Sequence, residues 1–261
     1  MNKQPWALIL GVSSGFGEAT ALELARAGMN IIGVHLDGRA RLPHVGEIQE
    51  RIRALGRDLE FFNGNAADDE KRKQWVEQIR QRLADPPGTL RVLLHSLSFG
   101  ALKPLAGAEE VAGRHQIELT ADVMGHSLVY WVQECLWAGL FDKGARIFAM
   151  TSAGGTRAIP QYGPVSAAKA ILESHIRQLA LELAPAGITA NAILAGVTDT
   201  PALRQVPGHE KLIELARLRN PHKRLTLPED VARCIAALCH PATYWMTGNT
   251  LHVDGGENIV G

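Results

Sequence analysis

The stretch "WALILGVSSGFG", residues 6–17, joins an unbroken apolar run to a loop with three glycines. An unbroken apolar run is typical of a strand that is buried on both faces of a sheet. The residues that follow, "EATALELARAG" at 18–28, are rich in helix formers and end at a glycine. The stretch therefore predicts a strand, a tight loop and a helix in direct succession, which together form the first unit of an α/β fold.

The same alternation of strands and helices continues along the chain. Apolar runs predict further strands at residues 30–36, 59–65, 90–97, 145–152, 187–194 and 249–255. Helical patterns occupy residues 46–56, 68–83, 120–140 and 163–184. This alternation predicts a Rossmann-like doubly wound parallel sheet of seven strands, with helices on both faces. No linker or repeat divides residues 1–261, so we expect a single domain.

Composition and charge exclude several classes of protein. Of the 261 residues, 46% are hydrophobic, which is enough for a sizeable core. Lys plus Arg and Asp plus Glu both number 27, whereas a nucleic-acid-binding protein would be basic. No apolar run approaches the roughly 18 residues that span a bilayer. Cys135, Cys234 and Cys239 lack the close spacing of a metal site, which indicates reduced thiols, no metal and a cytoplasmic protein.

The loop at residues 11–17 has Gly11, Gly15 and Gly17 four and then two positions apart. The usual dinucleotide fingerprint has its glycines two and then three positions apart, so this spacing differs from it. The loop can still bind a dinucleotide, because glycines let a backbone approach a pyrophosphate and the start of a helix offers free N–H groups. The alternative is a tight turn that needs glycine for its backbone conformation alone.

The G-x3-G-x-G spacing resembles the first loop of the short-chain dehydrogenase/reductases. The resemblance extends along nearly the whole chain, through "NAADDE" at 65–70, "GITANAIL" at 187–194 and "GNTLHVDGG" at 248–256. It implies that Asn65 and Ala66 contact the adenine of an NAD(P) cofactor. The other residues that it places beside the cofactor are Gly11, Ser13, Ser14, Gly15, Phe16, Gly17, Ser96 and Gly196.

The choice between NADPH and NADH depends on the end of the second predicted strand, "GVHLDGRA" at 33–40. A carboxylate there would bind the ribose 2′-hydroxyl of NADH, and basic groups would bind the 2′-phosphate of NADPH. In the alignment with the family, His35 holds the discriminating position, and Arg39 and Arg41 follow it. Asp37 lies about 20 residues beyond the glycine loop, where an acid that selects NADH can lie. The arginines favour NADPH slightly, with NADH as the alternative.

Tyr162 and Lys169 are seven positions apart in "QYGPVSAAKAILES", residues 161–174, whereas ordinary members of the family have the tyrosine four positions before the lysine. The fourth position back is Val165 here. Because a helix turns about 100° per residue, positions four and seven before a lysine lie near the same face. Ser152, 17 residues before Lys169, holds the place of the family serine. Only the tyrosine has therefore moved.

Two further departures accompany this shift. The segment "HSLS" at 95–98 replaces the family's N-N-A-G, and Met124 stands where the family has an asparagine. All three features resemble the enoyl-[acyl carrier protein] reductases, which use Y-x6-K. Ser152 and the segment "AGVTDTPAL", residues 195–203, resemble the ketoreductase-like branch often called type III. That resemblance places Thr198 and Thr200 near the nicotinamide and the pyrophosphate.

The resemblance implies NAD(P)H-dependent reduction of the C=C bond of an enoyl thioester by an enzyme that forms homotetramers. The acyl group is carried on acyl carrier protein or on coenzyme A. Tyr162 would donate a hydrogen bond to the thioester oxygen as negative charge builds on it. Lys169 would hold the ribose hydroxyls, and Ser152 would complete the catalytic group. The irregular stretch at about 196–224 would be a substrate flap outside the carboxyl end of the sheet.

Two other functions fit parts of the sequence. A carbonyl reductase or 3-oxoacyl thioester reductase has the same fold and would use a tyrosine, a lysine and a serine to protonate an alkoxide. A non-catalytic nucleotide-binding scaffold or redox sensor would need only the glycine loop. The retained Lys169 and Ser152 count against a scaffold, because cofactor binding alone does not require them. Tyr162 is, without the resemblance, an ordinary half-buried tyrosine at the start of a helix.

Overall fold

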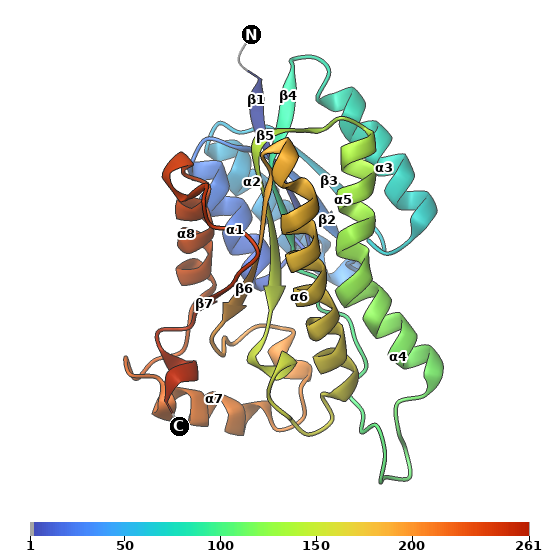
Figure 1. Ribbon diagram of the computed structural model, residues 1–261, viewed down its shortest axis with the longest axis vertical. Coiled ribbons are helices and arrows are strands. Elements are labelled where there is room, and N and C mark those ends of the chain that lie inside the picture. Colours follow the sequence, from blue (N-terminus) through green and yellow to red (C-terminus); the bar gives the residue numbers. More distant parts are fainter. Residues whose placement is uncertain (1–2, 261) are drawn as a thin grey trace.

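The computed structural model describes residues 3–260, which form one seven-stranded parallel sheet in the order β3-β2-β1-β4-β5-β6-β7 (Figure 1). The strands are β1 (Gln4–Leu10), β2 (Asn30–His35), β3 (Leu59–Asn63), β4 (Gly88–His95), β5 (Phe141–Thr151), β6 (Thr189–Ala195) and β7 (Thr250–Val253). The strand order reverses between β1 and β4, which are hydrogen-bonded neighbours. The predicted doubly wound fold is confirmed, and ligands of such sheets bind at this reversal, beyond the carboxyl ends of the strands.

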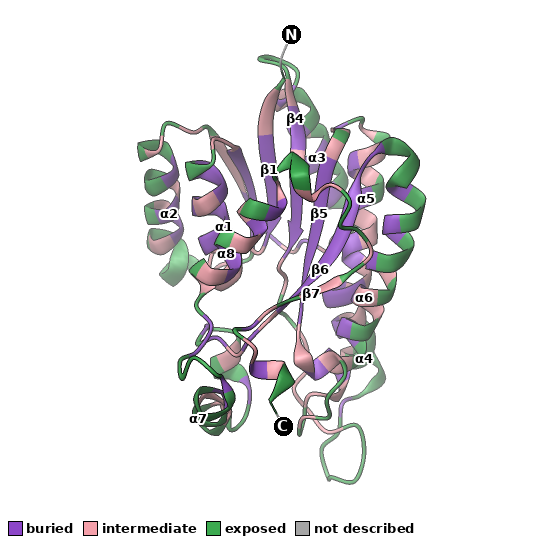
Figure 2. Cartoon of the chain, turned by 60° about the vertical axis from the view of Figure 1, so that its left-hand side comes forward, coloured by how far each residue is buried: buried purple, intermediate pink, exposed green. Residues whose placement is uncertain are grey.

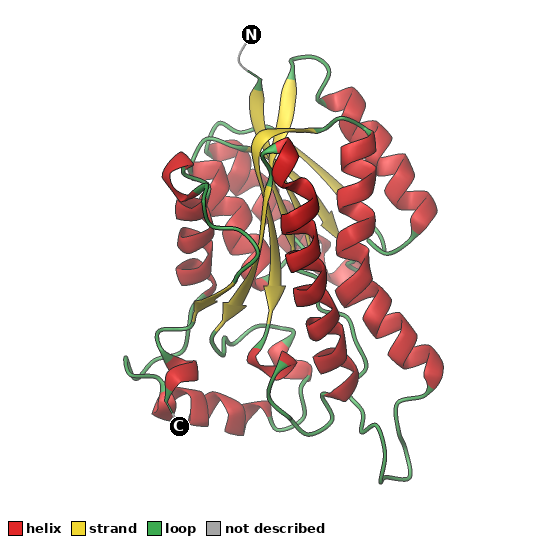
Figure 3. Ribbon diagram, viewed as in Figure 1, coloured by secondary structure: helices red, strands yellow, loops and turns green. Residues whose placement is uncertain are grey.

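Helices cover both faces of the sheet (Figures 1 and 3). They are α1 (Gly15–Arg26), α2 (Leu42–Ala54), α3 (Asp69–Arg82), α4 (Arg114–Ala121), α5 (Ser127–Trp137), α6 (Gly163–Leu183), α7 (His209–Arg219) and α8 (Pro228–Leu238). Apolar side chains of α1, α2 and α8 form the core on one face, and those of α3, α5 and α6 form the core on the other. None of the helices among residues 3–260 is long and apolar enough to cross a membrane.

Strand β1 shows why these apolar runs form a central sheet. Trp6, Leu8 and Leu10 point into one core, and Ala7 and Ile9 point into the other. All five are fully buried, and Figure 2 shows the central strands mostly in the colour of buried residues. Side chains alternate between the faces of a strand, so a strand covered on both sides must be apolar at every position. The unbroken run "WALIL" follows from this requirement.

The helix predicted at 120–140 is built from three parts. Helix α4 begins earlier, at Arg114, and a π-helical turn, η2 (Asp122–His126), separates it from α5. The Ser127 N–H bonds the carbonyl of Asp122, five residues back, as in a π-helix. Met124 lies in this turn and is 2% exposed. The position where the resembled family has an asparagine is therefore a widened, apolar turn packed against α6.

Candidate active site

The predicted site residues lie where successive strands end, along the carboxyl edge of the sheet. The glycine loop follows β1, His35 ends β2, Asn65 and Ala66 follow β3, Ser96 follows β4, Ser152 follows β5, and Gly196, Thr198 and Thr200 follow β6. In parallel strands these ends meet at one edge. Helix α7 and the carboxyl terminus lie at the same end of the molecule in Figure 1, opposite the amino terminus.

The three glycines of the loop lie where a Cβ atom would have little or no room. Gly11 and Gly15 have φ of 91° and 54°, in the left-handed region that favours glycine. A Cβ atom on Gly17 would overlap the Gly11 carbonyl oxygen, and one on Gly11 would overlap the Ser96 carbonyl oxygen. One on Gly15 would lie 3.2 Å from a methyl carbon of Thr200, so the loops after β1, β4 and β6 adjoin.

The start of α1 has the donors that a pyrophosphate needs. Ser14 is the N-cap residue, and among the described residues its side chain accepts no capping hydrogen bond. The N–H groups of the first turn are therefore available to an anion, and the helix dipole favours negative charge there. The loop thus fits a dinucleotide by its close backbone approach and by its free donors.

Asp37, which follows the end of β2, has a carboxylate that is already paired with other side chains. Asp37 lies 3.0 Å from Nδ1 of His35 and 3.1 Å from Nε of Arg41, and its side chain is 5% exposed. Asn63 holds its backbone, donating to the Asp37 carbonyl at 2.9 Å and accepting from the Asp37 N–H at 3.1 Å. His35 is buried against Asp37, while Arg39 is exposed in the short η1 helix (Arg39–Arg41). This end of the site therefore offers guanidinium groups and no free carboxylate at Asp37.

The predicted adenine loop is fixed by an indole. The carbonyl of Ala66 accepts a 2.8 Å hydrogen bond from Nε1 of Trp131 in α5, and Asn65 accepts from the Ala67 N–H at 3.0 Å. Trp131 is fully buried and stacks on Trp75 of α3 with ring centroids 6.4 Å apart. Its polar contact needed the fold, because Ala66 lies 65 residues away in the chain.

Tyr162 is the N-cap residue of α6, and its ring packs over Gly154, in the turn after Ser152. A Cβ atom on Gly154 would lie only 2.5 Å from that ring. The preceding Gln161 has φ of 62°, a left-handed conformation that is uncommon outside glycine and directs the chain into the helix. Burial raises the pKa of Tyr162, and a hydrogen bond with Ser152 partly opposes this. The phenol is therefore protonated at neutral pH and can donate a hydrogen bond.

Lys169 is buried on α6, with 5% of its surface exposed. Its Nζ donates to the Met150 carbonyl at 2.7 Å, near the end of β5. Burial lowers the pKa of Lys169 to about 8, and the nearby Glu173 carboxylate opposes this. Glu173 in turn accepts a 2.6 Å hydrogen bond from Thr151. The structure thus brings Ser152, Tyr162 and Lys169 to the end of one strand, with Lys169 cationic at neutral pH.

His95, which the sequence singled out only as a departure from the family, is fully buried beneath this site. Its Nε2 lies 2.8 Å from the Ser127 hydroxyl, which itself donates to the Val123 carbonyl in the π-turn. Nδ1 has no partner within residues 3–260. Burial, reinforced by the charge of Lys169, lowers the pKa of His95 to about 3, so the imidazole is neutral and only one of its nitrogens carries a proton.

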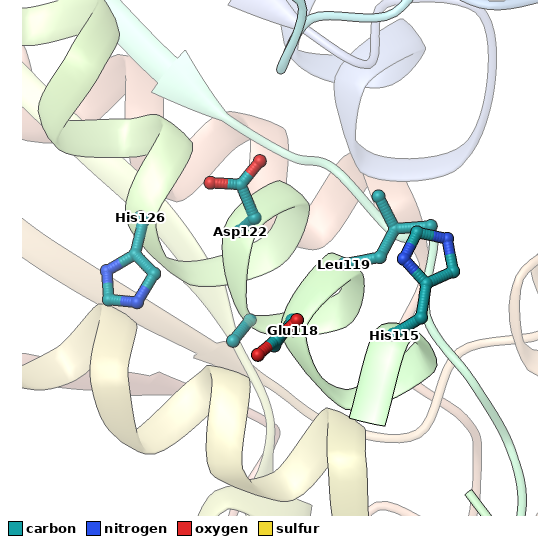
Figure 4. Close-up of a pocket in the computed structure, with 6 residues that line it drawn as sticks. His115, Glu118, Leu119, Asp122 and His126 are labelled. Atoms are coloured by element: carbon teal, nitrogen blue, oxygen red, sulfur yellow. The ribbon is translucent and has the colours of Figure 1, made fainter. Parts of the chain in front are cut away.

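The open hollow of Figure 4 lies elsewhere. It follows α4 and η2 and is lined by His115, Glu118, Leu119, Ala121, Asp122 and His126. The side chains labelled there do not converge on a common point (Figure 4). No group of three potential metal ligands occurs among residues 3–260. The hollow contains none of the predicted site residues.

A parallel sheet with a glycine loop after β1 and a tyrosine and lysine on α6 defines a dinucleotide-dependent oxidoreductase. The family model described as "Enoyl-(Acyl carrier protein) reductase" matches residues 11–258, and the chain belongs to this family. The predicted resemblance is confirmed, and with it an NAD(P)H-dependent enoyl reductase.

Curated relatives cover nearly the whole chain. The enoyl-[acyl-carrier-protein] reductase [NADH] of Nostoc is 30% identical, with 98% of this chain and 96% of that protein covered. The [NADPH] enzyme of Staphylococcus aureus is 27% identical, with 97% and 96% covered. The 1-cyclohexenylcarbonyl-CoA reductase of Streptomyces collinus is 30% identical, with 99% and 89% covered. Relatives that use either cofactor thus match equally well along their length.

Solved structures give the same family. The Bacillus cereus enoyl-acyl carrier protein reductase, solved with NADP+ and an indole naphthyridinone, superposes with a TM-score of 0.87 at 25% identity. The Aquifex aeolicus enoyl-[acyl-carrier-protein] reductase (NADH) superposes with a TM-score of 0.84 at 27% identity. Each match covers 99% of this chain and 97% of the other.

Proposed function

We propose that this enzyme reduces the C=C bond of an enoyl thioester with Tyr162 as the hydrogen-bond donor to the thioester oxygen. NADPH or NADH, when bound, supplies the hydride for the β-carbon. The observation that carries the proposal is the neutral, partly buried phenol of Tyr162 beside Ser152, one helical turn upstream of the ordinary position. A donor held where negative charge develops is worth most when it is already in place and shielded from water.

Lys169 and Ser152 have separate roles in this proposal. Lys169 holds the ribose hydroxyls of the cofactor, and its charge favours negative charge nearby. Ser152, whose hydroxyl partly opposes the rise in the pKa of Tyr162, orients the phenol. Neither group needs to deliver the final proton, because an enolate can take a proton at carbon from solvent.

We propose NADPH as the preferred cofactor, bound along the loop residues that the sequence predicts. The support is the engaged state of Asp37, whose carboxylate is paired with Arg41 and His35. An acid held in this way is a poor acceptor for the 2′-hydroxyl of NADH. The neighbouring Arg39 is exposed, so its guanidinium is available to bind the 2′-phosphate of NADPH.

We propose residues 196–224 as the substrate flap of a single domain, facing an acyl carrier protein. The segment contains η5 (Leu203–Gln205) and α7, and Leu218 on α7 is 64% exposed. Arg204 is paired with Asp199 at 2.8 and 3.0 Å, so Arg217 and Arg219 at the end of α7 are the better candidates for an acidic carrier.

We propose further that the enzyme is a homotetramer in the cytoplasm. Trp137 on α5 and Leu181 on α6 are 74% and 71% exposed, and large apolar side chains in this state favour burial by another copy. The free thiols Cys135, Cys234 and Cys239 are consistent with a reducing compartment. The mass of the purified protein in solution tests the tetramer.

The test of the activity is oxidation of NADPH and NADH by the purified protein, with crotonyl and acetoacetyl thioesters compared on both acyl carrier protein and coenzyme A. We expect turnover of the crotonyl thioester, faster with NADPH and with the protein carrier. Turnover of the acetoacetyl thioester alone would make the enzyme a 3-oxoacyl reductase, for which Ser152 beside Tyr162 is the favouring contact. Tight cofactor binding without turnover of either substrate would favour a scaffold.

A further inference from the structure

The loop after β6 is held by the carboxyl-terminal tail. Glu257 Oε2 accepts a 3.0 Å hydrogen bond from the Val197 N–H, and the Gly196 N–H donates to the Val253 carbonyl at 3.2 Å. A Cβ atom on Gly196 would overlap the Thr226 hydroxyl and lie 3.0 Å from Glu257 Oε2. The carboxylate thus sits directly against the main chain that precedes Thr198.

The tail is folded so that Glu257 faces inward. Asp254 accepts hydrogen bonds from the Gly256 N–H at 2.9 Å and from Asn258 at 3.1 and 2.7 Å. Its carbonyl accepts a 2.9 Å bond from the buried Asn220 amide. Gly255 and Gly256 have φ of 61° and 85°, which reverse the chain. Glu257 is left 7% exposed, although glutamate side chains are mostly exposed in folded proteins.

The tail also reaches the catalytic segment. Arg157, between Ser152 and Tyr162 in the chain, donates to the Asn258 carbonyl at 3.0 Å. Residues 254–258 therefore connect the loop after β6 with the segment that carries the catalytic hydroxyls. Burial raises the pKa of Glu257 and the Asp254 carboxylate adds to this, while the Val197 N–H and the charges of Arg157 and Arg219 oppose it only in part.

We propose that Glu257 is a positioning residue that holds the main chain at Gly196–Thr198 in the shape that receives the nicotinamide end of the cofactor. The inference rests on the proposed placement of the nicotinamide beside this loop. Thr200, further along, has anchors of its own, since its hydroxyl accepts from the Leu203 N–H at 3.2 Å and its carbonyl from the Arg204 N–H at 3.1 Å. Loss of Glu257 therefore affects the nicotinamide end more than the pyrophosphate end.

The test is equilibrium binding by the full-length protein of NADPH, NADH and two fragments that lack nicotinamide, ADP-ribose and 2′-phospho-ADP-ribose. Glu257→Met keeps the volume and removes the acceptor, and we expect about tenfold weaker binding of the dinucleotides. We expect the fragments to bind within about twofold of the wild type, and Glu257→Gln, which retains an acceptor oxygen, to restore dinucleotide binding. Because binding alone is measured, the outcome does not depend on whether the substrate is an enoyl or a keto thioester.

Glu257→Asp repeats the test with a smaller change, should the methionine variant not fold. Its carboxylate is one methylene shorter and should lose the Val197 N–H, with the same selective loss of dinucleotide affinity. Unchanged dinucleotide binding in the methionine or aspartate variant would overturn the proposal. An equal loss for fragments and dinucleotides, or a glutamine variant as weak as the methionine one, would overturn it too, because either result indicates a general structural role.

Discussion

The glycine loop at residues 11–17 and the proposed catalytic segment at residues 152–169 are both tightly packed, but the atoms that fill the space differ. In the loop, a Cβ atom on Gly17 would meet the Gly11 carbonyl, which is backbone. In the segment, a Cβ atom on Gly154 would meet the ring of Tyr162, which is a side chain. Backbone in a tight turn cannot move without breaking its hydrogen bonds, whereas a ring can rotate away.

This difference should separate the effects of substitutions on cofactor binding from their effects on turnover. The loop is rigid because its own main chain sets its shape, so any change there should disturb the cofactor and the fold together. The segment positions one phenol against a glycine, so changes there should alter the position of the phenol and leave the backbone nearly as it was. Substitutions in the two regions should therefore give different combinations of affinity and turnover.

The largest effect is expected for Gly17→Ala. The new methyl group would overlap the Gly11 carbonyl, so the loop must open and the start of α1 must shift. We expect cofactor binding to fall below detection, with a lower melting temperature, as measured by titration and thermal unfolding. The matched control is Gly46→Ala in α2, where a Cβ meets nothing within 4 Å. A Gly17→Ala protein that binds cofactor normally would show that the loop has more freedom than its contacts indicate.

Next in size is Tyr162→Phe, which removes one hydroxyl from the catalytic segment. We expect kcat to fall about 10²–10³-fold, the usual cost of losing one donor to a developing oxyanion, with cofactor affinity almost unchanged. Steady-state kinetics and cofactor titration measure the two quantities. The control is Tyr244→Phe, which changes the tyrosine just after the short η6 helix (Pro241–Thr243) and should keep full activity. Equal turnover by Tyr162→Phe and wild type would remove the phenol from the mechanism.

The third prediction concerns pH. Lys169 has a pKa of about 8, lowered by burial, so it is cationic below that pH and neutral above it. If the cation holds the cofactor ribose, kcat/KM should be level below about pH 8 and fall about tenfold per pH unit above it. Lys169→Met should be slow at every pH and lack this limb. A wild-type profile with no change near pH 8 would contradict the role of the charge.

The lowered pKa of Lys169 affects the stability of the fold in the opposite direction from its effect on activity as the pH rises. The unfolded chain binds the lysine proton more tightly, with the ordinary lysine pKa of 10.5, so the charged form opposes folding below about pH 8. The contribution of Lys169 to the free energy of unfolding should improve as the pH rises from about 8 towards 10.5. Activity and stability should therefore move in opposite directions over this range, which distinguishes loss of the charge from unfolding.

The two regions also differ in how far the sequence alone predicts them. Strand, loop and helix at residues 6–28 follow from local patterns, and the close contact of Gly17 is made with Gly11, six residues back. The contact of Gly11 with the Ser96 carbonyl needed the fold. Tyr162 and Lys169 could be proposed only with the resemblance to the family, because without it Tyr162 is an ordinary tyrosine at the start of a helix. The contacts of Glu257 with Val197 and of Trp131 with Ala66 span 60 and 65 residues, and no local pattern indicates them. The sequence does not indicate the π-turn at Asp122–His126 either, because apolar spacing alone fits a continuous helix.

The smallest effect is expected for Gly154→Ala, which tests the segment without removing a catalytic group. The added methyl would lie 2.5 Å from the Tyr162 ring, and the ring can rotate to relieve the overlap. We expect kcat to fall about tenfold, because a small displacement of a donor weakens its bond to the developing charge, with cofactor affinity unchanged. Gly155→Ala is the matched control, since its Cβ would make an ordinary 3.4 Å contact with Lys169. Loss of cofactor affinity in Gly154→Ala, comparable to that of Gly17→Ala, would show that the segment is as rigid as the loop and that the contrast between them does not hold.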